Sequence, residues 1–211
     1  MKAIWNALAV AVLVGWAQGA VAAPILFKAT LSGANEFPPN ASPGTGLAEI
    51  TIDSAAHSML VDASFSGLLG TTTAVHIHCC LASPFLTGVN VGVATTTPTF
   101  PGFPAGVTSG SYSQIFDMSL ASSYSGGFLA ANGGNPLAAE ATLFAAISAG
   151  KTYFNLHSSL FPGGEIRGFL VQVPEPLTLS VFGAGLAGAA LMRRRRKTQL
   201  RAAVTDAIQS K

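Results

Sequence analysis

Apolar and polar side chains alternate along the middle of this chain, and this period of two constrains the fold more than any other feature. Successive side chains of a β-strand point to opposite faces, whereas a helix requires a period near 3.6. The alternation is clearest in residues 47–53 and 58–65, which a short polar segment separates. Two such strands joined by a polar turn predict a β-hairpin. Its apolar face comprises Ala48, Ile50, Ile52, Met59, Val61, Ala63 and Phe65.

Further strand-like segments lie between turns rich in Gly and Pro, of which the chain contains 23 and 12. About seven short strands separated by such turns are typical of an antiparallel, Greek-key-like β-sandwich, so we predict an all-β fold. The Ala-rich segment 137–148, followed by Gly150, predicts one short helix. Residues 84–110 predict a long loop, because prolines are rare in central strands. The other strands are expected at 25–31, 73–81, 112–120, 151–157 and 165–173.

Charged residues make up only 9% of the chain, and they are unevenly placed. Such a low charge excludes a coiled coil, a disordered acidic tail and a general nucleic-acid-binding protein, so no nucleic-acid partner is expected. Residues 23–173 contain three Lys or Arg against seven Asp or Glu, whereas seven of the eleven basic residues lie in the last nineteen positions. The middle of the chain is therefore mildly acidic and its end strongly basic.

The first 22 residues have the three parts of a secretory signal peptide. Lys2 supplies the positive start, residues 8–16 form a short apolar run, and Ala20-Val21-Ala22 is a small-residue cleavage site. The alternative, a transmembrane helix, requires a longer apolar run. We therefore predict cleavage before Ala23.

The last part of the chain combines a Pro-rich motif, an apolar run and a basic cluster. Val173-Pro174-Glu175-Pro176 is followed by sixteen uncharged residues, 177–192, and then by Arg193, Arg194, Arg195, Arg196 and Lys197. Sixteen helical residues span about 24 Å, slightly less than the ~30 Å apolar core of a bilayer. Arginines can extend to the membrane surface, and such clusters stay on the cytoplasmic side. We expect a terminal hydrophobic, transmembrane helix here.

This three-part end resembles the PEP-CTERM sorting signal of Gram-negative bacteria, followed here by an additional basic tail, 198–211. The resemblance implies that an exosortase recognises the signal at the inner membrane and removes it. It also implies transient anchoring in that membrane and release to the cell surface or the extracellular matrix, where polysaccharide or surface proteins would be the partners. We divide the chain into a signal peptide (1–22), a β domain (23–172), a sorting signal (173–197) and the tail.

Two strand-like segments contain the residues that could bind a metal. In Ala74-Val75-His76-Ile77-His78-Cys79-Cys80, alternation places His76, His78 and Cys80 on one face. In the second segment, Tyr153, Asn155 and His157 share a face. Imidazole and thiolate ligands suit copper or zinc, and a third histidine on a neighbouring strand would complete a set of three ligands. The alternative is that these histidines are hydrogen-bonded structural side chains. His57 lies in a predicted turn and is expected to be solvated.

Cys79 and Cys80 are the only two cysteines of the chain. In an exported protein they would meet an oxidising compartment. Alternation along a strand points their side chains apart, so a bridge between them would break the strand end. A bridge between them, an intermolecular bridge and thiolate ligation all remain open at this stage.

A third block, Phe161-Pro162-Gly163-Gly164-Glu165-Ile166-Arg167-Gly168, predicts a tight turn before a strand. Glu165 and Arg167 are two residues apart and would share a face. We favour an ion pair between them that fixes the turn, so that Gly163, Gly164, Glu165 and Arg167 are structural. The alternative is that Glu165 is a catalytic or metal-binding carboxylate.

From about Phe27 to Leu170 the chain resembles the CHRD (chordin-type) domain family. Three blocks carry the resemblance: residues 31–39 (LSGANEFPP), His76-Ile77-His78, and 155–168 from Asn155-Leu156-His157-Ser158 to the Gly-Gly-Glu-Ile-Arg-Gly sequence. It implies an extracellular β-rich module similar to immunoglobulin-like or superoxide-dismutase-like sandwiches. The chain lacks the full histidine set of that dismutase. We therefore expect a non-enzymatic binding or structural module.

The alternative function is a copper- or zinc-binding domain, with or without redox activity. Its ligands would be His76, His78 and His157, with Cys80 or Glu165 as a fourth.

Overall fold

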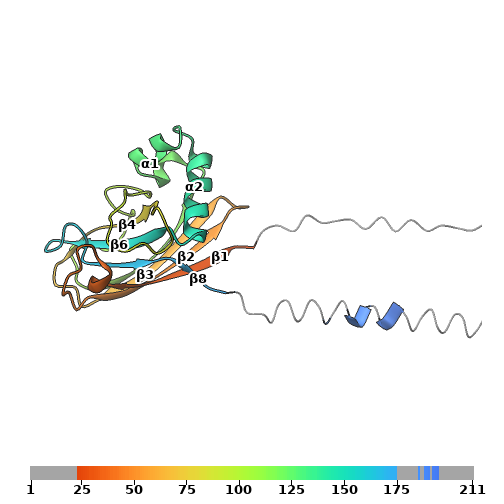
Figure 1. Ribbon diagram of the computed structural model, residues 1–211, viewed down its shortest axis with the longest axis horizontal. Helices are drawn as coiled ribbons and strands as arrows, with labels where there is room; N and C mark the ends of the chain where they lie inside the picture. The colour runs from red at the N-terminus through yellow and green to blue at the C-terminus, as the bar shows by residue number, and fades with distance from the viewer. Residues whose placement is uncertain (1–22, 175–184, 186–187, 191, 195–211) are drawn as a thin grey trace, which may run out of the picture. The chain divides into compact units, whose positions relative to one another are not determined.

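The computed structural model describes residues 23–174, 185, 188–190 and 192–194 (Figure 1). The chain divides into two units after Gln172, and the fold described below is that of the first. The predicted signal peptide, the tail 198–211 and most of the terminal helix lie outside the described residues. Residues 185, 188–190 and 192–194 have helical backbone. No helix in the described part of the chain is both long and apolar enough to cross a membrane.

The strands form one continuous antiparallel sheet that curls on itself (Figure 1). Their order across the sheet is β4-β6-β7-β1-β2-β3-β5, and β8 also pairs with β1. The all-β, antiparallel prediction is thus confirmed. Because the hydrogen bonds join all described strands in one sheet, the division into two packed sheets with Greek-key connections is not confirmed. The strands are β1 (Ile25–Ser32), β2 (Thr45–Asp53), β3 (Ser58–Ser66), β4 (Thr72–Cys79), β5 (Gly110–Asp117), β6 (Thr152–Ser158), β7 (Ile166–Phe169) and β8 (Val171–Gln172).

The hairpin predicted from the alternating pattern is formed by β2 and β3. Ile50 faces Val61 and Ile52 faces Met59 across the two strands, and these four side chains are at most 3% exposed. A shift of one residue in this pairing would move every apolar side chain to the other face. The hydrophobic pattern therefore determines the register of the hairpin.

The predicted loop 84–110 lies along the free edge of β4. Backbone amides of Ala94 and Phe100 donate to the carbonyls of Ile77 and Val75, at 2.9 and 3.3 Å, and Thr72 donates to Val107 at 2.8 Å. An edge strand with unpaired backbone groups invites aggregation, and covering it removes that hazard. This segment therefore closes the sheet beyond β4.

Two α-helices lie together on one side of the sheet (Figure 1). The predicted helix is α2 (Pro136–Ser148), which begins after Asn135; the Asn135 side chain accepts from two backbone amides of the first turn. It buries Leu143 and Ile147 in the core. The helix α1 (Gly126–Ala131) was not predicted, because two glycines at its start disfavour a helix. Two short 3-10 helices, η1 (Gly33–Asn35) and η2 (Ala121–Ser123), complete the described elements.

Both faces of β4 and β6 are largely covered, and the two faces differ in chemistry. Val75 and Ile77 of β4 face the hydrophobic core. His76 and His78 point to the opposite face, where they are 6% and 8% exposed. The candidate site therefore lies on this second face, which is buried but carries imidazoles where aliphatic side chains would be expected.

The close approach of β7 to β1 yields a first prediction. A Cβ on Gly168 would lie 2.3 Å from the backbone oxygen of Thr30, which cannot move without disturbing the sheet. Gly168→Ala should therefore lower the free energy of unfolding by about 1–3 kcal/mol or more, measured by urea denaturation. Gly163→Ala is the control, because its Cβ would have no neighbour within 4 Å. Equal stability of the two variants would contradict this account of the β1–β7 contact.

Candidate metal centre

His76, His78 and His157 come together on the outer face of β4 and β6. His76 and His78 lie on β4, and His157 is opposite Ala74, which shares their face. One ligand nitrogen from each of the three side chains lies within 4.8 Å of the other two. The ring centroids are 5.3–5.9 Å apart. The structure thus brings together the three predicted histidines.

Each imidazole has one nitrogen bound to a backbone carbonyl and one without a partner. A ring nitrogen that faces a carbonyl must carry the proton, because a carbonyl oxygen can only accept. The carbonyls therefore fix the tautomer and leave a lone pair on the other nitrogen of each ring. These unpartnered, buried atoms are Nδ1 of His76, Nε2 of His78 and Nε2 of His157. The carbonyls are those of Pro98 for His76 (2.6 Å), Val91 for His78 (2.8 Å) and Pro162 for His157 (2.9 Å).

The surroundings keep all three rings neutral. Burial lowers the pKa of His76, His78 and His157 below the ordinary value of 6.5, because the charged form loses its hydration. The pKa of His78 falls to about 4, with further lowering from the neighbouring histidines and Arg167. Neutral imidazole is the form that binds metals, so the ligands are in their binding state at pH 7.

The donor set fits a transition-metal ion better than it fits water. A water molecule can donate two hydrogen bonds, which would leave one of the three buried acceptors unpaired. One cation can accept a lone pair from all three nitrogens. Zinc binds imidazole at about 2.0–2.1 Å, so nitrogens within 4.8 Å of one another need only a small contraction to reach it. Imidazole nitrogen suits zinc and copper.

Cys80 does not belong to this group. It forms a disulfide with Cys79, which leaves neither sulfur as a thiolate. Of the three outcomes open from the sequence, the structure therefore has the bridge between adjacent residues. Cys79 is buried and Cys80 exposed, and the bridge comes immediately after His78 at the end of β4.

Glu165 is buried but lies in a different hydrogen-bond network. Its carboxylate accepts from the Ser42 hydroxyl and the Leu69 amide, both at 2.6 Å, and from the Gly70 amide at 3.2 Å. Burial alone would raise the pKa of Glu165, but these bonds and one from Ser158 outweigh it and lower that pKa. The carboxylate therefore anchors two loops, and the structure does not place it among the three histidines.

The predicted ion pair between Glu165 and Arg167 is wrong. Arg167 is 1% exposed and lies 3.9 Å from Glu36 instead. Its guanidinium donates from Nε to the Asn35 carbonyl, and from Nη1 to Asn90 Oδ1 at 2.9 Å. Glu165 precedes the first residue of β7, so strand alternation does not apply to it.

Glu36 is a buried charged residue that the sequence analysis did not identify as a candidate. It is 4% exposed, and its Oε1 is buried without a partner. Burial raises the pKa of Glu36 to about 7, against a lowering effect of Arg167. A Cβ on Gly164 would lie 2.7 Å from both Glu36 Oε1 and the Asn155 amide, and the φ of +131° at this position strains any other residue. The one sequence signal for Glu36 was its place in the 31–39 block.

A model of the CHRD domain matches residues 27–170 of the chain. The chain belongs to the CHRD family. No curated protein and no solved structure matches it. The matched range contains every residue of the candidate centre, and the resemblance inferred from the three blocks is confirmed.

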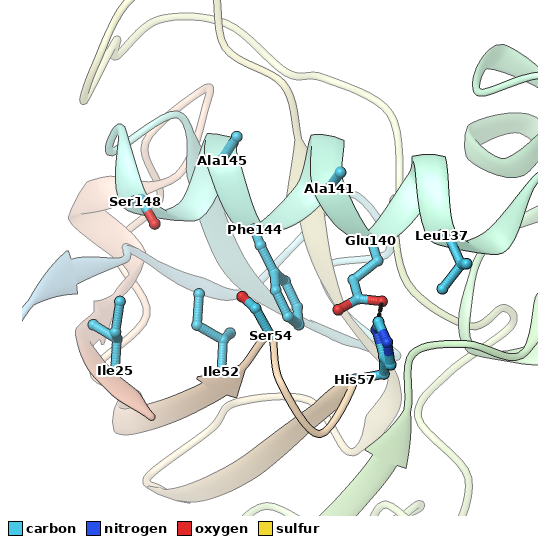
Figure 2. A pocket seen from close by; sticks show the side chains of 10 residues that line it. All are labelled: Ile25, Ile52, Ser54, His57, Leu137, Glu140, Ala141, Phe144, Ala145 and Ser148. Atoms are coloured by element: carbon cyan, nitrogen blue, oxygen red, sulfur yellow. Dashed lines mark hydrogen bonds and ion pairs between the residues drawn. The ribbon is translucent and has the colours of Figure 1, made fainter. Parts of the chain in front are cut away.

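His57 of the CHRD domain is not simply solvated, as the turn suggested. Its side chain is 49% exposed, and its Nδ1 lies 2.8 Å from Oε2 of the buried Glu140 on α2. Figure 2 shows this pair at one end of a mostly apolar pocket of about 400 Å³, into which Phe144 points. The pocket also contains Ile25 and Ile52 and is separate from the three histidines.

Opposite pKa shifts at Glu36 and His78 yield a second prediction, for the metal-free protein. His78 titrates near 4 when folded and near 6.5 when unfolded, so stability falls as pH drops through that range. Glu36 titrates near 7 when folded and near 4.5 when unfolded, so stability rises as pH drops through that range. Glu36→Gln removes the second effect. Between pH 7 and pH 4.5, the free energy of unfolding of the Glu36→Gln variant should therefore fall by about 3 kcal/mol more than that of the wild type.

The measurement is urea unfolding of both proteins at several pH values in the presence of a chelator. Parallel pH profiles for the two proteins would contradict the assignment of a buried, proton-binding Glu36.

Proposed function

We propose that this CHRD domain is an exported, non-enzymatic binding module that holds one copper or zinc ion with His76, His78 and His157. The observation that carries the proposal is the set of three buried nitrogens within 4.8 Å, each left without a partner by a carbonyl bond on the other side of its ring. Hydrogen bonds of this kind fix the tautomer and the orientation of histidines that bind metals.

The burial of the ligand atoms supports binding rather than turnover. A catalytic metal keeps an open coordination position that substrate can reach. Here the unpartnered nitrogens have almost no exposed surface, because the loops that supply the carbonyls also cover the site. A substrate would have to displace these loops, and the ligand geometry would be lost with them.

Several features support export of the domain. The two chain ends have the composition of a signal peptide and of a PEP-CTERM signal over 173–197. The Cys79–Cys80 disulfide is compatible with an oxidising compartment and rare in the cytosol. On this proposal an exosortase processes the chain at the inner membrane, and the mature domain acts at the cell surface or in the polysaccharide matrix.

The family resemblance also suggests a relation to immunoglobulin-like and superoxide-dismutase-like sandwiches, and we propose it here. Phe100 lies between two distant strands of the curled sheet, with its ring centroid 6.1 Å from Phe154 of β6 and 5.2 Å from Phe116 of β5. Opposite ends of the sheet thus share one core, as the two layers of a Greek-key sandwich do.

Metal binding is the third prediction. The purified full-length chain, stripped with a chelator, should take up one Zn²⁺ or Cu²⁺ per molecule in calorimetric titration and elemental analysis. His76→Ala, His78→Ala and His157→Ala should each weaken binding at least about 100-fold, because two imidazoles hold these ions poorly. His57→Ala is the matched control and should bind as wild type does, since His57 lies in the other pocket. Absence of stoichiometric uptake by wild type would refute the proposal.

Processing of the ends is the fourth prediction. Mass spectrometry of the protein recovered from the surface fraction of its host should show Ala23 as the first residue. The peptides that follow Pro176 should be missing. Replacing Val173-Pro174-Glu175-Pro176 with alanines should retain the protein in the membrane fraction, because the sorting enzyme would no longer recognise it. A cytoplasmic, unprocessed protein would refute export.

A further inference from the structure

We propose that Arg167 is a positioning residue of this centre: it holds the ring of His78 so that Nε2, and not Nδ1, faces the other two imidazoles. The inference rests on the proposed metal-binding function and assigns a role to a side chain that the sequence marked as structural. Two chains of contacts lead from Arg167 to His78, one through the segment 89–91 and one through Tyr153.

The first chain passes through the backbone of the 89–91 segment. Arg167 Nη1 donates to Asn90 Oδ1 at 2.9 Å and to the Val89 carbonyl at 3.3 Å. The next residue, Val91, supplies the carbonyl that accepts from His78 Nδ1 at 2.8 Å. The segment has other anchors as well: Asn90 Nδ2 donates to the Phe37 carbonyl at 2.9 Å, and the Gly92 carbonyl accepts from the Cys79 amide at 3.0 Å. Arg167 adds two bonds to this set, at the two residues that directly precede Val91, and so helps to fix the position of the Val91 carbonyl.

The second chain is a stack of rings. The Tyr153 ring lies parallel to that of His78, with centroids 4.8 Å apart and 8° between their planes. The carbon of the Arg167 guanidinium lies 4.6 Å from the centroid of the same tyrosine. The Tyr153 hydroxyl in turn accepts from the Val91 amide at 3.1 Å. Arg167, Tyr153 and Val91 thus form one contiguous unit around His78.

Only arginine matches this arrangement. Its guanidinium donates in two directions at once, from Nε to the Asn35 carbonyl and from Nη1 to the 89–91 segment, while its flat face lies over an aromatic ring. A lysine ammonium is a point charge and cannot span both acceptors. With Arg167 replaced, the Val91 carbonyl is held by fewer contacts and the Tyr153 ring loses its cation, so His78 can turn its protonated nitrogen toward the centre.

The experiment compares Arg167→Lys and Asn90→Ala with Glu165→Gln in the full-length chain. Glu165→Gln is the matched control, because Glu165 is another fully buried charge two residues away that anchors different loops. Each protein is titrated with Zn²⁺, loaded with Cu²⁺ for electron paramagnetic resonance, and unfolded in urea. Asn90→Ala removes an exposed side chain with its bonds to Arg167 and to the Phe37 carbonyl, so we expect it to fold even where Arg167→Lys does not.

We expect Arg167→Lys to bind Zn²⁺ about 10–100-fold more weakly, the usual effect of losing a residue that orients a ligand, and Asn90→Ala to follow it in part. Their Cu²⁺ spectra should show fewer than three coordinated imidazoles. Glu165→Gln should lose stability yet keep three imidazoles and near wild-type affinity.

Two outcomes would overturn the inference while leaving the metal site intact. One is wild-type affinity and three imidazoles in both test variants, and the other is an equal loss in Glu165→Gln. If wild type itself binds no metal, the proposed function fails first and the role of Arg167 fails with it.

Discussion

Three hydrogen bonds from imidazoles to backbone carbonyls are the interactions on which the rest of this site depends. Each bond places the proton on one ring nitrogen and leaves the other nitrogen, which is buried, with a free lone pair. The carbonyls of Val91, Pro98 and Pro162 belong to loops and not to the strands that bear the histidines. The chemistry of the β4–β6 face is therefore determined by loops that fold over it, and the sheet supplies the platform.

The two buried charges of the 163–168 block show how such loops are held. Glu165 anchors the segments around Ser42 and Leu69, and Arg167 anchors those around Asn35 and Asn90. A buried charge without hydrogen bonds is costly, so each of these side chains requires its loop in place as much as the loop requires it. This mutual requirement couples the loops around the candidate metal centre to the fold of the sheet.

Sequence patterns predicted those features that depend on residues close together in the chain. Period-two alternation located the β2–β3 hairpin, and the same rule placed His76 and His78 on one face. It failed at Glu165, because Gly164 has a φ of +131° and turns the chain just before β7 begins. The partners of Arg167 lie 77–132 residues away along the chain, and no spacing rule reports such contacts. Glu36 and the curling of the sheet were missed for the same reason.

The long range of these contacts bears on how the site would be filled. The histidines come from β4 and β6, and their carbonyl partners come from three separate loops, so an unfolded chain has no preformed set of ligands. An ion that binds only the folded domain stabilises it in proportion to the logarithm of its concentration over Kd. On the proposed function, exchange of such an ion would require the loops that supply the carbonyls to move. On the proposed function, the free energy of metal binding therefore adds to the stability of a domain that its hydrophobic core also holds together.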